Sequence, residues 1–110
     1  MRMPQHTLHV YGKACELLRA VNRAQIADAG LRRQAVTAAQ SVCLNAAEGA
    51  GRVTKADKGR AFTIARGECV EASAAVEVAW ISGTASESAH HEVASIASEV
   101  YAMLTALIRR

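Results

Sequence analysis

The stretch AHHEVASIASEVYAMLTALIRR, residues 89–110, has the clearest helical period in the chain. Its apolar residues recur at spacings of four and three, which places their side chains on one face of an α-helix. They are Ala89, Val93, Ile96, Val100, Met103 and Leu107. Thr84 followed by Glu87 fits a capping box just before this stripe. The pattern predicts a helix from about residue 85 to residue 109.

Two upstream segments have the same period. One apolar stripe predicts a helix over residues 55–81 and consists of Phe62, Ala65, Cys69, Ala72, Val76 and Ala79. Thr54 and Asp57 fit an N-terminal cap, and Gly83 fits the turn that follows. The other stripe predicts a helix that stops at Gly49 and Gly51, and it consists of Leu31, Ala35, Ala38, Val42 and Ala46.

The N-terminal third predicts one more helix. Tyr11, Cys15, Leu18 and Asn22 share a helical face with Leu8. The segment NRAQIADAG, residues 22–30, is typical of a fraying helix end and a linker, with Asp28 as a possible cap of the next helix.

The order and spacing of these elements predict an all-α fold. Short connections make consecutive helices antiparallel neighbours, so we expect an up-down-up-down four-helix bundle. A chain of 110 residues supports a single domain over residues 1–110. The second and third helices have alanines outside the main stripes, at positions 39, 47, 61, 74 and 75. A surplus apolar face favours self-association, although alanine is also a good helix former at exposed positions.

Charge and cysteine content restrict the function only mildly. Lys and Arg number 13 against 10 Asp and Glu, giving a formal charge of +3 that permits an acidic partner without requiring one. The odd number of cysteines, Cys15, Cys43 and Cys69, fits reduced thiols in the core better than a disulfide framework. No segment has the length and composition of a signal peptide or a membrane span, so we expect a cytoplasmic protein without a membrane partner.

A spaced motif links the end of the second helix to the third. Its residues are Asn45, Glu48, Gly49, Gly51, Arg52, Thr54, Ile64, Ala65, Gly67 and Glu71. The segment containing them, residues 34–71, resembles the four-helix-bundle family of proteins encoded in 23S ribosomal RNA intervening sequences. The chain departs from the family pattern at Thr37, Cys43 and Glu68, where the family usually has Arg, Pro and Ser.

The resemblance implies a homo-oligomer, typically a pentameric ring, without known catalytic activity. The same superfamily includes the accessory variability proteins of diversity-generating retroelements, which form basic barrels that engage RNA and a reverse transcriptase. On this basis, RNA, a nucleoprotein and a reverse transcriptase are the expected partners, next to further copies of the chain.

The polar and glycine residues of the motif have structural interpretations. Asn45, Glu48 and Glu71, if buried, need hydrogen bonds, for which Arg52, the backbone of residues 49–51 and a neighbouring subunit are candidates. Gly67 in the middle of a helix indicates a close approach by another helix, either within the bundle or across subunits. The sequence GAGR, residues 49–52, lacks the ending and the preceding strand of a phosphate-binding loop.

A basic cluster is the candidate nucleic-acid site. It consists of Arg52, Lys55, Lys58, Arg60 and Arg66. Repeated around a ring, these residues would form a positive band able to neutralise several phosphates. The alternative is a solvated helix surface that Asp57 and Glu68 partly balance. Because no aromatic residues alternate with the cations, any contact would depend on shape and charge and not on base sequence.

No arrangement of residues indicates an enzyme. A nucleophile, a base and an orienting group do not occur at usable spacing. Glu87 and His90 form one Glu-x-x-His pair, whereas a di-iron bundle needs two. We therefore expect no metal, no cofactor and no small-molecule substrate. The sequence predicts a non-enzymatic, RNA-binding or nucleoprotein-binding oligomer, with a protein-binding scaffold that does not touch nucleic acid as the alternative.

Overall fold

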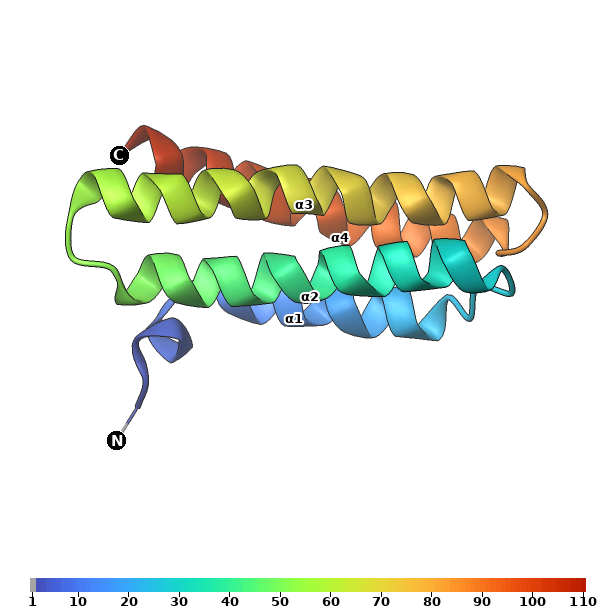
Figure 1. Cartoon of the computed structure of the whole chain (residues 1–110), viewed down its shortest axis with the longest axis horizontal. Coiled ribbons are helices and arrows are strands. Elements are labelled where there is room, and N and C mark those ends of the chain that lie inside the picture. Colours follow the sequence, from blue (N-terminus) through green and yellow to red (C-terminus); the bar gives the residue numbers. More distant parts are fainter. Residues whose placement is uncertain (1) are drawn as a thin grey trace.

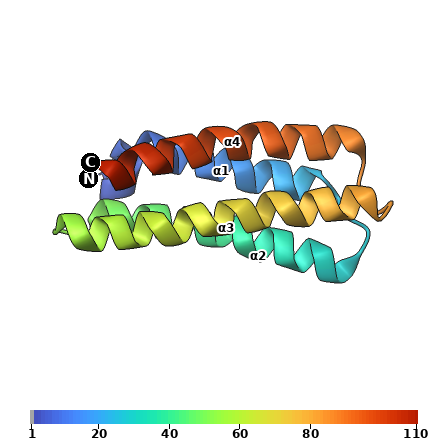
Figure 2. The ribbon, with the colours of Figure 1, turned by 90° about the horizontal axis from the view of Figure 1, so that it is seen from above.

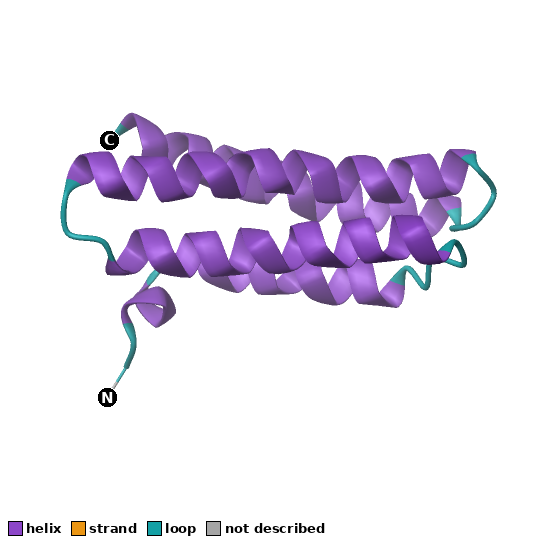
Figure 3. Cartoon of the chain, viewed as in Figure 1, coloured by secondary structure: helices purple, strands orange, loops and turns teal. Residues whose placement is uncertain are grey.

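Four helices run alternately up and down along one bundle (Figure 1). The computed structural model describes residues 2–110, and within this range every regular element is helical (Figure 3). The elements are the 3-10 helix η1 (Pro4–Thr7) and the α-helices α1 (His9–Arg23), α2 (Ala29–Gly51), α3 (Lys55–Ile81) and α4 (Glu87–Arg109). The predicted all-α bundle is confirmed.

Each long helix packs against two others. α1 contacts α2 and α4, and α3 also contacts α2 and α4, with the most extensive packing between α2 and α3. The view from above shows the two layers, α1 with α4 and α2 with α3 (Figure 2). The α2–α3 turn, η1 and the last turn of α4 all lie at one end of the bundle (Figures 1 and 2).

Small side chains dominate the core. Thirteen of the 25 buried hydrophobic residues are alanines, most of them on α2 and α3. Larger residues complete the core, among them Leu17, Val42, Phe62 and Leu104. Because alanine carries little bulk, α2 and α3 can pack closely along much of their length.

Side-chain caps begin three of the four α-helices, α2, α3 and α4. The Asp28 carboxylate accepts a hydrogen bond from the backbone N–H of Leu31, and the Thr54 hydroxyl accepts one from that of Asp57. Both predicted caps are therefore confirmed, and α3 has the predicted bounds. Gly83 has a φ of +83°, the left-handed conformation that lets the chain turn after α3.

The predicted cap of α4 is wrong. Ser86 is the N-cap, and its hydroxyl accepts a hydrogen bond from the backbone N–H of Ala89. Thr84 instead belongs to the preceding turn, where its hydroxyl donates to the carbonyl of Ala79 and its own carbonyl accepts from the N–H of Ala27. This second bond joins the α3–α4 turn to the α1–α2 linker.

The buried face of α1 differs from the prediction. Val10, Ala14, Leu17 and Val21 are buried, whereas the predicted stripe one position along is half-buried at Tyr11, Cys15 and Leu18 and exposed at Asn22. In the linker, Ile26 is buried and anchors the segment that was expected to fray. The two neighbouring stripes of α1 both contain apolar side chains. Packing against α2 and α4 therefore decides which stripe is buried.

No helix within residues 2–110 combines the length and the hydropathy needed to cross a membrane.

Candidate functional site: the groove between α2 and α3

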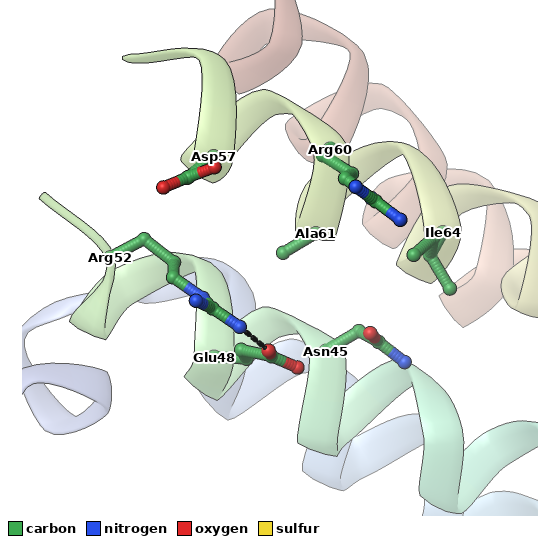
Figure 4. A pocket seen from close by; sticks show the side chains of 7 residues that line it. All are labelled: Asn45, Glu48, Arg52, Asp57, Arg60, Ala61 and Ile64. Atoms are coloured by element: carbon green, nitrogen blue, oxygen red, sulfur yellow. Dashed lines mark hydrogen bonds and ion pairs between the residues drawn. The ribbon is translucent and has the colours of Figure 1, made fainter. Parts of the chain in front are cut away.

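A groove between the C-terminal part of α2 and the first turns of α3 contains four of the ten motif residues, Asn45, Glu48, Arg52 and Ile64 (Figure 4). Its volume is about 340 Å³. The lining residues are Asn45, Glu48 and Arg52 from the α2 side and Asp57, Arg60, Ala61 and Ile64 from α3. We call this feature the α2–α3 groove.

The polar residues of the groove are accessible, and two of them form an ion pair. The Arg52 guanidinium pairs with the Glu48 carboxylate one helical turn earlier, and this hydrogen bond raises the pKa of Arg52. The side-chain amide of Asn45 donates to the carbonyl and the hydroxyl of Ser41, at 2.9 and 3.0 Å. Among the described residues, no polar or charged one is buried. These side chains are therefore available to another molecule.

The surroundings of two motif glycines distinguish their roles. α2 continues through Gly49 and ends at Gly51, so Gly49 is a buried helical residue and does not form the turn. A Cβ atom at Gly49 would lie 2.4 Å from Cε1 of Phe62, which makes this glycine the point of close approach between α2 and α3. A Cβ atom at Gly67 would meet no atom of the chain within 4 Å. The predicted close approach at Gly67 is thus absent within the described chain.

Glu71 lies outside the α2–α3 groove. It is exposed and lies two turns of α3 beyond Ile64. Its neighbour on the helix is Glu68, whose pKa is raised by burial and by the charge of Glu71. The expected hydrogen bonding of Glu48 to Arg52 is present, whereas Glu71 does not join it.

The structure divides the basic cluster among three places. Arg52 and Arg60 line the α2–α3 groove. Lys55 and Lys58 point to another side of α3, toward η1 and the end of α4, where both line a second pocket. Arg66 lies roughly 16 Å along α3 from Lys55, at about 1.5 Å per residue, and it contacts α4.

Three of these cations contact groups of their own chain. Besides the Arg52–Glu48 pair, Nζ of Lys58 donates to the carbonyl oxygens of Gly49 and Ala50, each at 3.2 Å. Arg66 donates to the Thr105 hydroxyl at 3.2 Å, and its guanidinium lies 5.4 Å from the centre of the Tyr101 ring. Lys55 and Arg60 have no hydrogen bond or ion pair within residues 2–110.

The chemistry of the α2–α3 groove suits recognition. Its charged groups are the carboxylates of Glu48 and Asp57 and the guanidiniums of Arg52 and Arg60. Paired guanidinium and carboxylate groups form directional hydrogen bonds with the complementary groups of a partner. The groove can therefore bind a polar surface.

The comparison with known proteins agrees with the motif. Residues 6–106 match the sequence model of a family described as the 23S rRNA-intervening sequence protein. The chain belongs to this family. None of the curated proteins matches the chain. The description of the 23S rRNA-intervening sequence protein family names no enzymatic activity.

An exposed apolar face on α3 was only partly predicted from the sequence. The exposed residues from 63 to 81 are Thr63, Ile64, Gly67, Val70, Glu71, Ala74, Glu77, Val78 and Ile81. We call this set the α3 face, and only two of its nine residues are charged. The signal in the sequence is a second apolar stripe at helical spacing. The alanine at position 74 was noted above, and valines and isoleucines belong to the same stripe.

The buried thiols predict an alkaline loss of stability. Cys69 is only 1% exposed and its thiol donates to the carbonyl of Ala97 at 3.3 Å. Burial raises the pKa of Cys69 from 9.0 to about 11. The unfolded chain therefore releases this proton first, so the contribution to stability is complete below pH 9 and is lost as the pH rises toward 11. We expect this thiol to lower the free energy of unfolding by roughly 2 kcal/mol across that range.

Chemical unfolding of wild type and Cys69→Ala at several pH values tests this expectation. Cys43, whose pKa burial raises to about 12, is present in both proteins, as are the lysines and tyrosines. Their titrations cancel in the comparison. The stability difference between the two proteins should shrink between pH 9 and pH 11, and a constant difference contradicts the assignment.

Proposed function

We propose that this protein is a non-enzymatic homo-oligomer, a pentameric ring in the cytoplasm, that acts as an RNA-binding or nucleoprotein-binding accessory protein. A reverse transcriptase is the proposed protein component of such a complex. The observation that carries the proposal is the α3 face, because an accessible and mostly apolar helix surface favours burial against another protein surface. The subunit number follows from the family resemblance alone.

The α3 face supports self-association through its side chains and its extent. Ile64, Val70 and Val78 are each about half exposed, and Ile81 is 71% exposed. They lie along 18 residues of helix, roughly 27 Å at about 1.5 Å per residue. Gly67 and Ala74 between them leave room for a neighbouring helix. Apolar surface buried in this way is the main driving force for association.

The proposed contact with RNA rests on the basic cluster. Lys55 and Arg60 are exposed and have no partner in the described chain, so each can contact a phosphate without breaking an existing bond. Arg52 keeps its charge within its pair with Glu48, and the pair can rearrange at little cost because it is exposed. Repetition in a ring multiplies these contacts and makes binding strongly dependent on salt.

A protein-binding scaffold that does not contact nucleic acid is the second candidate. Lys58, Arg66 and Arg52 each contact groups of their own chain, which reduces the number of cations free to bind phosphates. The cluster is also divided among different sides of α3, unlike a continuous basic track. These contacts favour a structural role for part of the cluster.

Light scattering of the purified protein with and without mixed RNA, at about 50 and 200 mM salt, separates the two candidates. We expect an oligomer that takes up RNA at low salt and loses much of it at higher salt. An oligomer that ignores RNA at both salt concentrations supports the scaffold. A monomer of 11.6 kDa at all concentrations contradicts both.

Charge reversal identifies the residues involved. Lys55→Glu combined with Arg60→Glu should weaken RNA binding by about tenfold or more. The slope of log affinity against log salt concentration should also fall, by the amount that corresponds to about two phosphate contacts. Arg19→Glu combined with Arg33→Glu changes the net charge equally at exposed positions outside the cluster and is the matched control. Equal losses in both variants would show that net charge, and not the cluster, governs binding.

A further inference from the structure

A second pocket lies at the end of the bundle where η1, the α2–α3 turn and the last turns of α4 meet. Its volume is about 560 Å³, within the range of roughly 300 to 1,000 Å³ that is typical of small-molecule sites. We call it the end pocket. It is separate from the α2–α3 groove, since the two share no lining residue.

The lining of the end pocket combines apolar and positively charged side chains. The apolar side chains are Pro4, Leu8, Ala50, Val53, Phe62, Leu107 and Ile108. The charged side chains are Lys55, Lys58 and Arg110, and no carboxylate side chain lines the pocket. A ligand complementary to this lining has an apolar body and an anionic head.

The two lysines have different environments. Lys58 is half-buried, and its ammonium group is held by the carbonyl oxygens of Gly49 and Ala50, so it offsets the partial negative charge at the end of α2. Lys55 is exposed and has no ion pair or hydrogen bond in the described chain. Lys55 is thus the cation available to an incoming anion. Lys58 offsets the partial negative charge at the end of α2, which would otherwise repel that anion.

We propose that the end pocket binds a free aliphatic carboxylate of medium chain length. The alkyl chain lies among Leu8, Phe62 and Leu107, and the carboxylate lies beside Lys55. This proposal goes beyond the assembly and RNA binding proposed above and does not depend on either. It concerns a ligand that is bound without being chemically changed.

Calorimetric titration of the full chain with decanoate, below its micelle concentration and without RNA, tests the proposal. Decanol and decylammonium have the same chain with a neutral or a positive head, and we expect both to bind at least about threefold more weakly. Equal binding of all three compounds overturns the proposal, because the cations would then play no part. The proposal is also overturned if the protein binds to vesicles of anionic phospholipid but does not bind free decanoate.

Two variants locate the site. Ala50→Leu places a larger side chain in the pocket and should abolish decanoate binding, while Lys55→Glu should weaken it by about threefold to tenfold. Thermal unfolding shows whether the Ala50→Leu variant remains folded. If that variant unfolds, Lys55→Glu still tests the proposal, because it changes only an exposed residue. Decanoate binding that Lys55→Glu leaves unchanged overturns the proposal.

Arg60→Glu is the control that separates this proposal from RNA binding. Arg60 lines the α2–α3 groove and is absent from the end pocket. We expect its reversal to weaken RNA binding and to leave decanoate binding unchanged. A parallel loss of decanoate binding in Arg60→Glu would overturn the assignment of the anion to the end pocket.

Discussion

The Ile64→Glu/Val78→Glu double variant should be monomeric at concentrations at which the wild-type protein is oligomeric. Both residues belong to the α3 face and are 46% exposed in the isolated chain. Burying an unpaired carboxylate in an apolar interface costs several kcal/mol. That cost recurs at every interface of a ring, so the expected change is complete dissociation to the 11.6 kDa chain, measured by light scattering.

A matched control separates the α3 face from net charge. Ser88→Glu combined with Ala102→Glu adds the same charge at two exposed positions of α4 with the same spacing of fourteen residues. We expect this variant to remain oligomeric. Retention of the wild-type mass by Ile64→Glu/Val78→Glu would exclude the α3 face as the interface. Dissociation of both variants would point to charge repulsion.

The dissociated Ile64→Glu/Val78→Glu variant should keep the fold of the bundle. Substitutions at exposed positions without specific contacts usually alter the free energy of unfolding by less than about 0.5 kcal/mol. Circular dichroism and thermal unfolding of the double variant measure this. A large loss of helical signal would mean that folding and assembly are coupled, and the monomeric bundle would then not be stable by itself.

Gly49→Ala should destabilise the bundle, although alanine is the better helix former. The new Cβ atom would lie 2.4, 2.7 and 2.8 Å from three carbon atoms of the Phe62 ring, which is itself buried. The ring or the helix must move. Overpacking of this kind costs about 1 to 3 kcal/mol. Over most of this range, the cost exceeds the gain of about 1 kcal/mol from helix propensity.

Gly67→Ala is the matched control, since it makes the same substitution in open space. No atom of the chain lies within 4 Å of its Cβ position, so we expect a gain of up to about 1 kcal/mol. Urea unfolding in the Ile64→Glu/Val78→Glu background removes any contribution of assembly to these values. If Gly49→Ala is as stable as Gly67→Ala, the close approach of Phe62 does not constrain this position.

A double-mutant cycle identifies Phe62 as the cause. Phe62→Leu alone should destabilise by removing buried ring atoms. Combined with Gly49→Ala, it should cost less than the sum of the two single changes, because the smaller side chain gives the new methyl group space. Strict additivity would contradict the proposed clash.

Local sequence patterns predicted the helices because helix formation depends on neighbours along the chain. The periods of α2, α3 and α4 and the caps at Asp28 and Thr54 involve residues at most a few turns apart. Short turns between these helices then left an antiparallel bundle as the simplest arrangement. The cap of α4 was misassigned because Thr84 and Ser86 are both capable N-caps, and Thr84 is bonded in the preceding turn.

The candidate site was less predictable because its parts come from different helices. The motif residues Asn45, Glu48 and Arg52 do share one groove, as expected for one helical face and the residue after it. The members of the basic cluster lie close together in the sequence. Because a helix turns about 100° per residue, Lys55 and Arg60 nevertheless lie on different sides of α3. Sequence proximity therefore overestimated their proximity in space.

The sequence by itself determined four helices, their approximate ends and their antiparallel order, because periodicity and capping are local properties. Only the tertiary structure decided which of two adjacent stripes α1 buries and which glycine meets a neighbouring ring. It also decided which cations remain free of intramolecular contacts. These outcomes depend on which helices lie beside each face, and that arrangement results from packing the whole alanine-rich core at once.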